Sequence, residues 1–333
     1  MIFLEQAFDI PSVVQVKEGA GTILYFRATL PLGENRVAVV PNMARALLAS
    51  LRAAERNHQW VKRVVLVGLE PLFNAPVKGA EGFDFAFDSF LDTLTALKDE
   101  PVQLVLRVRA GTKQIKRLRA ARLLLKSLSP RLAIELGLPS LNPEHCEMLE
   151  GPGGELPSDR LRFAEILSAW EIPVRVRIDP LLPMLTDQRN VLDRFFAALA
   201  RVGVARVAVR YLVLTPQRAQ NLAPRLNRLH REMMKACFAE SAWQKPTQGL
   251  SVYDGAQTFK RLPDTIRSSG HKRILNAASR VGILVDIMDP VNPRKEGVKT
   301  SSAVTRKSKL RKSRRTLNPQ TNEQMELFVQ RRA

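Results

Sequence analysis

Cysteine is scarce in this chain of 333 residues, in which only Cys146 and Cys237 occur. Two thiols far apart in the sequence exclude a disulfide-stapled scaffold and any iron–sulfur or zinc site built from several cysteines. Histidine is also rare, and His145 beside Cys146 offers two metal ligands without further partners. A packed or surface role is therefore favoured for this pair, and no metal site is predicted.

Long apolar runs and familiar catalytic motifs are missing as well. No stretch approaches the roughly 20 apolar residues that cross a bilayer. No GxSxG, P-loop or HExxH pattern occurs, so hydrolase and nucleotidase functions have no motif behind them and no catalytic residue is assigned. There is no charged-then-apolar leader, and we expect a cytoplasmic protein, with the nucleoid as one location.

Acidic residues are outnumbered, with 32 Asp and Glu against 52 Lys and Arg and a formal net charge of +20. A polyanionic partner is therefore expected, and DNA, RNA and anionic membranes would all be attracted. The scarcity of aromatic residues and the lack of a basic amphipathic helix at either end weigh against a membrane. Nucleic acid remains, with DNA favoured by the motifs described below.

Apolar runs rich in Val, Ile and Leu alternate with segments of helical periodicity. The expected strands span residues 36–40, 63–69, 102–108, 131–137, 174–179 and 205–212, followed by a seventh at 283–287. The expected helices span residues 43–56, 83–98, 112–127, 159–170, 188–202, 215–238 and 272–280. Strands flanked by helices in this way are buried on both faces. The pattern predicts an α/β fold, a partial or complete parallel (β/α) barrel.

Three regions follow from this interpretation. Residues 1–35 are expected to form an N-terminal cover or extension, residues 36–290 the barrel, and residues 291–333 a flexible basic tail that carries a docking peptide. Chemistry in parallel barrels sits at the carboxyl ends of the strands, so the residues just past each strand are the candidate site.

Two strand ends carry distinctive residues. The second strand leads into Gly68-Leu69-Glu70-Pro71, and the fifth leads into Asp179-Pro180-Leu181-Leu182-Pro183. Together with Arg160-Leu161 near the start of the fourth helix, these elements resemble the radical SAM superfamily. The closer resemblance is to its spore photoproduct lyase and DNA repair photolyase branch, over roughly the middle two-thirds of the chain. The resemblance implies a radical SAM-like barrel.

The resemblance also implies a cofactor pocket. In the superfamily a Gly-Gly-Glu-Pro type turn meets the amino group of S-adenosylmethionine, and this chain matches it at Gly68, Glu70 and Pro71, with Asp179 as a further pocket residue. A structural role stays open for each position. Glu70-Pro71 can simply end a strand, and Asp179-Pro180 can set a turn because proline restricts the residue before it.

The chain departs from the family where the metal cluster should be. Radical SAM proteins hold a [4Fe–4S] cluster with a CxxxCxxC loop after the first strand. Here the expected loop follows Val40 and reads Pro41-Asn42-Met43, without a thiol. The cluster ligands are missing, so no cofactor is predicted and cluster chemistry is expected to be lost. Glu70 is then a remnant, or it binds another small amine.

Basic residues cluster in two places. The first cluster begins at the third strand, where residues three or four apart share a helical face. Its predicted DNA-binding residues are Arg107, Arg109, Lys113 and Lys116. The second cluster lies in residues 301–315, which hold no acidic residue and are expected to be disordered. Its predicted DNA-binding residues are Arg306, Lys307, Lys309, Arg311, Lys312, Arg314 and Arg315.

A short peptide follows the second cluster. The run Gln324-Met325-Glu326-Leu327-Phe328 is similar to the pentapeptide with which bacterial polymerases and mismatch-repair proteins dock on the sliding clamp. Gln324 would bind the pocket rim, and Met325, Leu327 and Phe328 would fill apolar subsites. The alternative is that this segment packs back on the barrel. A basic tether ending in a docking peptide would raise the local concentration of the barrel at DNA.

These observations predict a DNA-associated protein of repair or replication, in which a degenerate barrel binds DNA and a bacterial sliding clamp without cluster chemistry. Two alternatives remain open. One is an active radical SAM-like lyase whose cluster ligands come from elsewhere, or whose Glu70, Asp179 and Asp187 act as acids or bases. The other is an RNA-binding factor, which would prefer RNA at equal salt and would not use Leu327 or Phe328.

Overall fold

The computed structural model describes residues 2–3, 13–18, 21–31, 37–40, 42–73, 83–245 and 258–288. The chain divides by its contacts into residues 1–290 and residues 291–333. All the described residues belong to the first unit. The predicted basic tail and its docking peptide lie outside the described residues.

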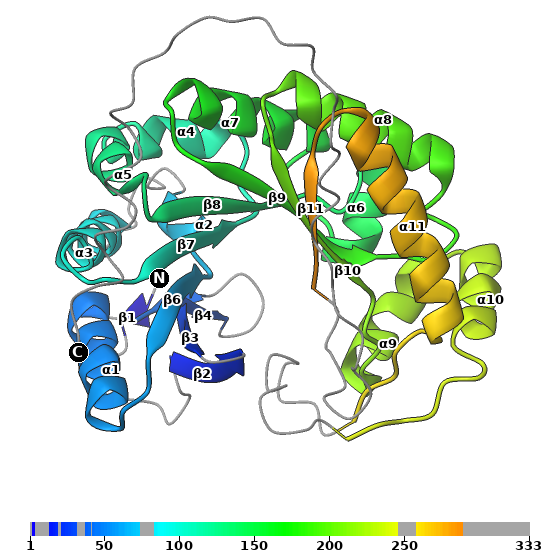
Figure 1. Ribbon diagram of the computed structural model, residues 1–333, viewed down its shortest axis with the longest axis horizontal. Coiled ribbons are helices and arrows are strands. Elements are labelled where there is room, and N and C mark those ends of the chain that lie inside the picture. Colours follow the sequence, from blue (N-terminus) through cyan, green and yellow to red (C-terminus); the bar gives the residue numbers. More distant parts are fainter. Residues whose placement is uncertain are drawn as a thin grey trace, which may run out of the picture. The chain divides into compact units, whose positions relative to one another are not determined.

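The main sheet has eight strands in the order β11-β10-β9-β8-β7-β6-β3-β2. Seven of them, from β3 through β6 to β11, run parallel, and β2 pairs antiparallel to β3 at one edge. The strands are β2 Val13–Glu18, β3 Gly21–Arg27, β6 Val61–Val67, β7 Gln103–Val108, β8 Leu132–Gly137, β9 Val174–Leu181, β10 Arg206–Tyr211 and β11 Leu284–Ile287. The sheet curves without closing, and its helices follow the outside of the curve (Figure 1). The fold is a partial α/β barrel.

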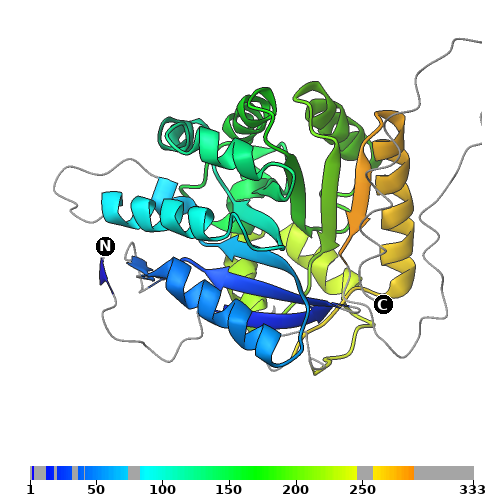
Figure 2. The same ribbon diagram turned by 60° about the vertical axis from the view of Figure 1, so that its left-hand side comes forward.

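The helices of the described residues vary from one turn to nearly five. They are α1 Met43–Arg56, α2 Glu70–Phe73, α3 Phe83–Ala96, α4 Thr112–Leu118, α5 Arg122–Leu128, α6 Pro143–Glu150, α7 Pro157–Ala169, α8 Arg189–Arg201, α9 Pro216–Leu222, α10 Arg228–Cys237 and α11 Asp264–Arg280. Leu47, Phe90, Phe163 and Phe196 are fully buried, one each from α1, α3, α7 and α8. Burying one such side chain contributes about 1.5–3 kcal/mol, which explains the helical spacing of apolar residues. The second view shows these helices layered against the strands (Figure 2).

The prediction of the first barrel strand was wrong. Residues 36–40 were expected to open the barrel, but β5 Val37–Val39 pairs with β1 Ile2–Phe3 and β4 Thr29–Pro31 in a separate three-stranded sheet. The neighbour of β6 is instead β3, which lies within the region predicted to be a cover. The physical reason is strand length. The seven residues of β3 pair with β6 on one side and β2 on the other, whereas β5 has only three residues.

The other predicted strands are confirmed as β6 to β11, including the seventh. Two predicted helices are divided. Residues 112–127 form α4 and α5, and residues 215–238 form α9 and α10 with a short 3-10 turn at Ala223–Arg225 between them. Pro224 lies in that turn and lacks the amide hydrogen that a continuous helix needs. Among the described residues, no helix is both long enough and apolar enough to span a membrane.

Candidate functional site

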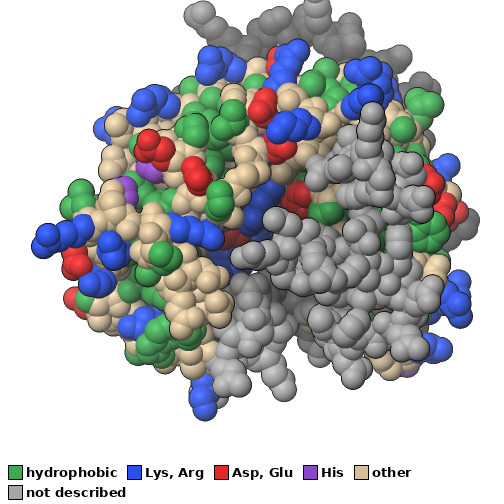
Figure 3. Space-filling view, turned by 180° about the vertical axis from the view of Figure 1, so that it is seen from behind, with side chains coloured by type: hydrophobic (Ala, Val, Ile, Leu, Met, Phe, Trp, Pro, Cys, Tyr) green, Lys and Arg blue, Asp and Glu red, His purple; other side chains and the backbone are tan. Residues whose placement is uncertain are grey.

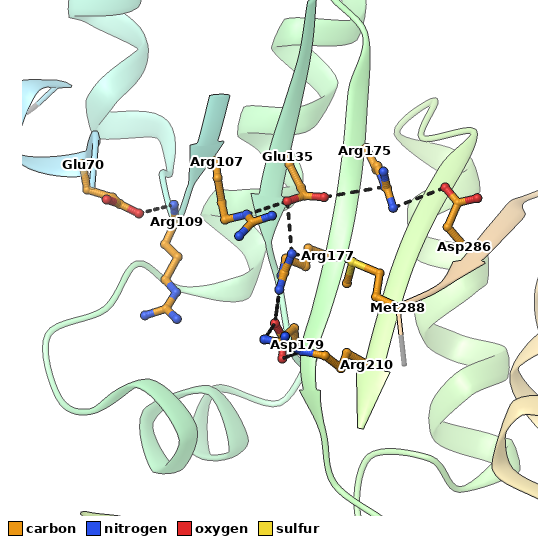
Figure 4. Close-up of polar contacts among 10 residues, drawn as sticks. All are labelled: Glu70, Arg107, Arg109, Glu135, Arg175, Arg177, Asp179, Arg210, Asp286 and Met288. Carbon is orange, nitrogen blue, oxygen red and sulfur yellow. Dashed lines mark hydrogen bonds and ion pairs between the residues drawn. The ribbon is translucent and has the colours of Figure 1, made fainter. Parts of the chain in front are cut away.

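The inward face of the barrel carries a row of charged side chains. Successive side chains of a strand point to opposite faces, so Arg175, Arg177 and Asp179 of β9 share one side of the sheet. In the strand register, Glu135 of β8 lies opposite Arg107 of β7 and opposite Arg175. Figure 4 shows these residues and Arg210 of β10 converging across four neighbouring strands. We call this set the charged lumen.

Glu135 is the centre of the charged lumen. Its Oε2 accepts a hydrogen bond from Arg107 Nε at 2.6 Å and another from Arg177 Nη1 at 3.3 Å. Arg175 Nε lies 3.7 Å from its Oε1. Burial raises the pKa of Glu135, but the charges of Arg107, Arg177 and Arg175 together lower it by more. The pKa of Glu135 therefore lies below its ordinary value. Glu135 is therefore a fixed carboxylate that balances several guanidinium groups.

Asp179 is a second fixed carboxylate. Arg177 Nε donates to its Oδ2 at 2.9 Å, and Arg210 donates to both oxygens, at 3.1 Å from Nε and 2.6 Å from Nη2. Burial raises the pKa of Asp179, yet Arg177 and Arg210 hold it well below its usual range. The Asp179–Pro180 peptide bond is cis. The residue predicted to line a cofactor pocket is thus engaged by two arginines.

The Gly68-to-Pro71 turn joins the ends of two strands. Gly68 has φ +70°, and a Cβ there would lie 2.9 Å from Thr29 Oγ1, which donates to the Gly68 carbonyl. This left-handed backbone and close approach both favour glycine. Glu70 begins α2, and its Oε1 accepts the amide N–H of Arg109 at 2.8 Å. Glu70 therefore connects the carboxyl ends of β6 and β7, as Figure 4 shows.

Asp187, the third residue considered as an acid or base, has different neighbours. Its side chain is 1% exposed, and its Oδ2 accepts from Tyr211 Oη at 2.7 Å and from Arg273 Nη2 at 2.6 Å. Its Oδ1 accepts the amide of Met184 at 2.6 Å. These contacts anchor α11 to β10, so Asp187 holds two elements together.

The predicted DNA-binding residues of the first basic cluster are separated. Arg107 points into the charged lumen, where it also lies over the Tyr25 ring at 5.6 Å. Arg109 is 55% exposed, with its Nε 3.4 Å from Glu150 Oε1. Lys113 and Lys116 are exposed on α4, and Lys113 is 3.8 Å from Glu155. The structure therefore puts Arg107 inside the barrel and the two lysines outside it. The predicted residues of the tail lie outside the described part of the chain.

The residues present do not fit a [4Fe–4S] cluster. The segment between β3 and α1, residues 28–42, has no cysteine. Cys146 is buried on α6, where its Sγ donates to the Ser140 carbonyl at 3.2 Å, and burial raises its pKa to about 11. Burial also raises the pKa of Cys237 on α10. In the part of the chain that the structure describes, no three His, Cys, Asp or Glu side chains are grouped to hold a metal ion.

Sequence reasoning missed the charged lumen. Glu135, Arg175, Arg177 and Arg210 were not among the predicted site residues, although a signal was present. The strand sequence Val174-Arg175-Val176-Arg177-Ile178-Asp179 alternates apolar and charged residues. A strand of a helix-covered parallel sheet is usually apolar on both faces, so this alternation indicates a polar inner face.

Solved structures of one enzyme share this architecture. A cysteine-to-serine mutant of spore photoproduct lyase matches with a TM-score of 0.54 and 10% identity, over 75% of this chain and 68% of that chain. A double mutant of the same enzyme, with bound AdoMet and dinucleoside spore photoproduct, matches with a TM-score of 0.53 and 11% identity, over 75% and 67%. The fold of this chain is therefore similar to that of spore photoproduct lyase.

At such low identity the likeness shows the fold alone. A radical SAM methyltransferase from Sphaerobacter thermophilus reaches a TM-score of 0.45 at 13% identity, over 83% of this chain and 68% of that chain, which is too weak to argue from. No family model matches the chain, and the search of curated proteins found no match. The partial barrel carries a row of arginines and carboxylates, and the segment between β3 and α1 contains no cysteine.

Proposed function

We propose that this protein binds DNA in repair or replication through the exterior of its radical SAM-like barrel, without cluster chemistry. The observation that carries the proposal is the charge of residues 101–134, which contain no Asp or Glu. Exposed cations of this stretch gather on α4 and α5 and the turn between them. This α4–α5 basic face consists of Lys113, Lys116, Arg119 and Arg122.

The spacing of these cations suits contact with a phosphate backbone. Lys113, Lys116 and Arg119 follow one another at intervals of three residues, which puts neighbouring members on one side of a helix. Lys113 meets Glu155 only at 3.8 Å and is 80% exposed, so its charge is largely available. Each phosphate that such a cation neutralises releases condensed counterions, which favours binding at low salt.

Two further observations support DNA as the polyanion. The barrel resembles spore photoproduct lyase, one structure of which contains a dinucleoside spore photoproduct. Lys and Arg side chains also outnumber acidic ones among the charged groups on the face seen in Figure 3. A surface of this kind binds backbone phosphates without reading sequence, so the proposal is for DNA affinity that depends on salt.

The segment at residues 291–333 adds two elements to the proposal. The cations at residues 306–315 supply a second contact with phosphates, and Gln324, Met325, Leu327 and Phe328 dock on a sliding clamp. Tethering would strengthen a weak contact between the barrel and DNA, because once one linked surface is bound the effective concentration of the other at the DNA is raised.

The test is the binding of a fluorescent DNA duplex to the full chain, measured by anisotropy over a range of salt concentrations. A Lys113→Gln, Lys116→Gln, Arg119→Gln variant should bind more weakly. The slope of log K against log salt should become shallower by about 0.9 for each phosphate that is no longer neutralised. The matched control is Arg45→Gln, Arg52→Gln, Arg56→Gln, which removes the same charge from exposed positions of α1.

The two triple variants distinguish DNA binding at the α4–α5 basic face from attraction of DNA by the net charge of the protein alone. An equal decrease of affinity in both would remove the α4–α5 basic face from the proposal. Tighter binding of an RNA of equal length at the same salt would favour the RNA-binding factor.

The active lyase makes a different prediction, namely iron and sulfide retained after anaerobic reconstitution, and S-adenosylmethionine binding abolished in Glu70→Ala. A colourless protein that does not bind S-adenosylmethionine would dismiss it.

A further inference from the structure

A cavity of about 520 Å³ lies at the amino ends of the barrel strands, away from the turn at Glu70. Its walls come from the first residues of β7 to β10 and from Arg63 near the start of β6. The side chains that matter here are Arg63, Gln103, Val105, Ala133, Arg175 and Arg206. Closed barrels fill this end with layers of bulky apolar side chains, and the residues there serve stability. In this open barrel guanidinium groups and Glu171 share the lining of the space with aliphatic side chains such as Leu104 and Leu132.

The arginines of this cavity outnumber the acids near them, and the one acid in its lining, Glu171, is 72% exposed and pairs with Lys126. Arg175 and Arg206 lie opposite each other in the β9–β10 register, which is unfavourable for two like charges. They share Asp286, at 3.3 Å from Arg175 Nη2 and 2.9 Å from Arg206 Nε. Glu135 is also near Arg175, but its strongest contact is the 2.6 Å hydrogen bond from Arg107. Figure 4 shows Arg175 between Glu135 and Asp286.

Two hydrogen-bond donors in the cavity remain unsatisfied. The Nε atoms of Arg63 and Arg175 are buried and make no hydrogen bond among the described residues; Arg175 Nε has only an ion-pair contact of 3.7 Å with Glu135 Oε1. The Arg63 guanidinium donates from Nη2 to Gln103 Oε1 at 3.5 Å, which is a long contact. Buried donors on charged groups are nearly always satisfied, because leaving one unpaired costs free energy. A bound anion is one way in which such donors are satisfied.

The electrostatic environment points the same way. Burial lowers the pKa of Arg175, and the charges of Arg63 and Arg206 lower it further, beyond what Glu135 and Asp286 restore. The cavity therefore holds mutually repelling cations in a partly buried place. An anion between them would offset both the repulsion and the desolvation.

We propose that this cavity binds a phosphate-bearing small molecule of nucleotide size, with Arg63 and Arg175 donating to its phosphate oxygens. Guanidinium groups suit the choice because their planar forks match phosphate oxygens in pairs. The volume lies within the range of small-molecule sites, about 300–1,000 Å³, so a nucleoside can accompany the phosphate. Arg206 is 59% exposed and lies where the cavity meets solvent. The terminal phosphate group comes from a free nucleotide or from the 5′ end of a nucleic-acid strand.

The test is calorimetric titration of the full chain with pyrophosphate, with ADP and with a 5′-phosphorylated dinucleotide, at constant ionic strength. We expect saturable binding that weakens about tenfold or more in Arg63→Gln and in Arg175→Gln. Arg52→Gln, an exposed change on α1, is the control and should bind like the wild type. If Arg175→Gln also lowers the melting temperature, the Arg63→Gln variant decides the test. The contact between the Arg63 guanidinium and Gln103 is long and exposed, so its loss should not affect folding.

The ligands distinguish the two sources of phosphate. If the protein binds ADP and not the dinucleotide, the ligand is a free nucleotide. If it binds the dinucleotide and not ADP, the ligand is the 5′ end of a strand. No saturable binding of any of the three, or equal affinity in the wild type and both arginine variants, would overturn the inference. The α4–α5 triple variant should bind the phosphate ligand normally, so failure of the DNA proposal and failure of this one are separate results.

Discussion

Glu135 on β8 accepts a 2.6 Å hydrogen bond from the guanidinium of Arg107, its register partner on β7. The side chain of Glu135 is 4% exposed and that of Arg107 is 23% exposed. A buried carboxylate that accepts hydrogen bonds from two arginines and lies near a third is costly to remove, since the guanidinium groups would then repel each other without compensation. The charged lumen is therefore stable only as a set.

Removal of this carboxylate should destabilise the barrel. Glu135→Gln should lower the free energy of unfolding by about 3–5 kcal/mol, as expected when one partner of a buried ion pair is removed. Urea unfolding at neutral pH measures the change. The control is Glu232→Gln, which breaks an exposed pair with Lys235 at 2.9 Å and should cost less than about 1 kcal/mol. Similar decreases in the two variants would show that the lumen is not a coupled network.

Stability should also depend on acid pH. The folded-state pKa values of Glu135 and Asp179 lie below their ordinary values of 4.5 and 3.8, so the unfolded chain binds protons more readily. Their stabilisation is complete above those values and is lost as the pH falls through them towards the folded-state values. The free energy of unfolding should therefore decline below pH 4.5, and Asp179→Asn should remove part of the decline below pH 3.8. Urea unfolding at successive pH values checks this, and an unchanged acid limb in Asp179→Asn would contradict it.

A glycine in the middle of α11 should resist replacement. A Cβ at Gly270 would lie 1.5 Å from Tyr211 Oη and 3.1 Å from Asp187 Oδ2. Alanine is favoured over glycine in a helix by about 1 kcal/mol, but the clash displaces α11 and breaks the Tyr211–Asp187 hydrogen bond. Gly270→Ala should therefore lower the melting temperature. Ser268→Ala, at an exposed position of the same helix, should leave it unchanged or raise it. A Gly270→Ala protein as stable as the wild type would refute the close packing of α11 on β10.

The docking peptide should bind a sliding clamp by itself. A peptide of residues 316–333 should bind a purified bacterial clamp saturably, and the Leu327→Ala, Phe328→Ala peptide should not bind because two apolar anchors are removed. Fluorescence anisotropy of labelled peptides measures both. A Gln320→Ala peptide is the control, since this residue lies outside the pentapeptide. Absence of binding would leave residues 306–315 as a contact with polyanions only.

Much of the fold was predictable because local pattern and global arrangement agree. The face of a strand that packs against helices must be apolar, and the helix that covers it must be apolar on one side, so the succession of strands and helices from β6 to β11 is visible in the sequence. The first barrel strand was missed because residues 21–27 and 36–40 are both short apolar segments. Only pairing with β6, from a distant part of the chain, distinguishes β3 from β5.

The sequence did not show which partners the candidate site residues have, for a related reason. Arg107 and Lys113 are six residues apart and were grouped in one basic cluster. The strand turns the Arg107 side chain inward to Glu135, whereas the helix after it turns Lys113 outward to solvent. Asp179 was expected beside Glu70 in a pocket, but its immediate partners are Arg177 and Arg210, which strand alternation and register bring together.

The sequence by itself determined the alternation of strands and helices, the excess of basic charge and the lack of thiols for a metal cluster, because these depend on composition and on contacts between near neighbours. Only the tertiary structure decided which strand opens the barrel, which arginines face Glu135 and Asp179, and where guanidinium groups surround a cavity. Those features depend on the register of strands that are distant in the chain. A shift of one residue in that register would turn each charged side chain to the opposite face of the sheet.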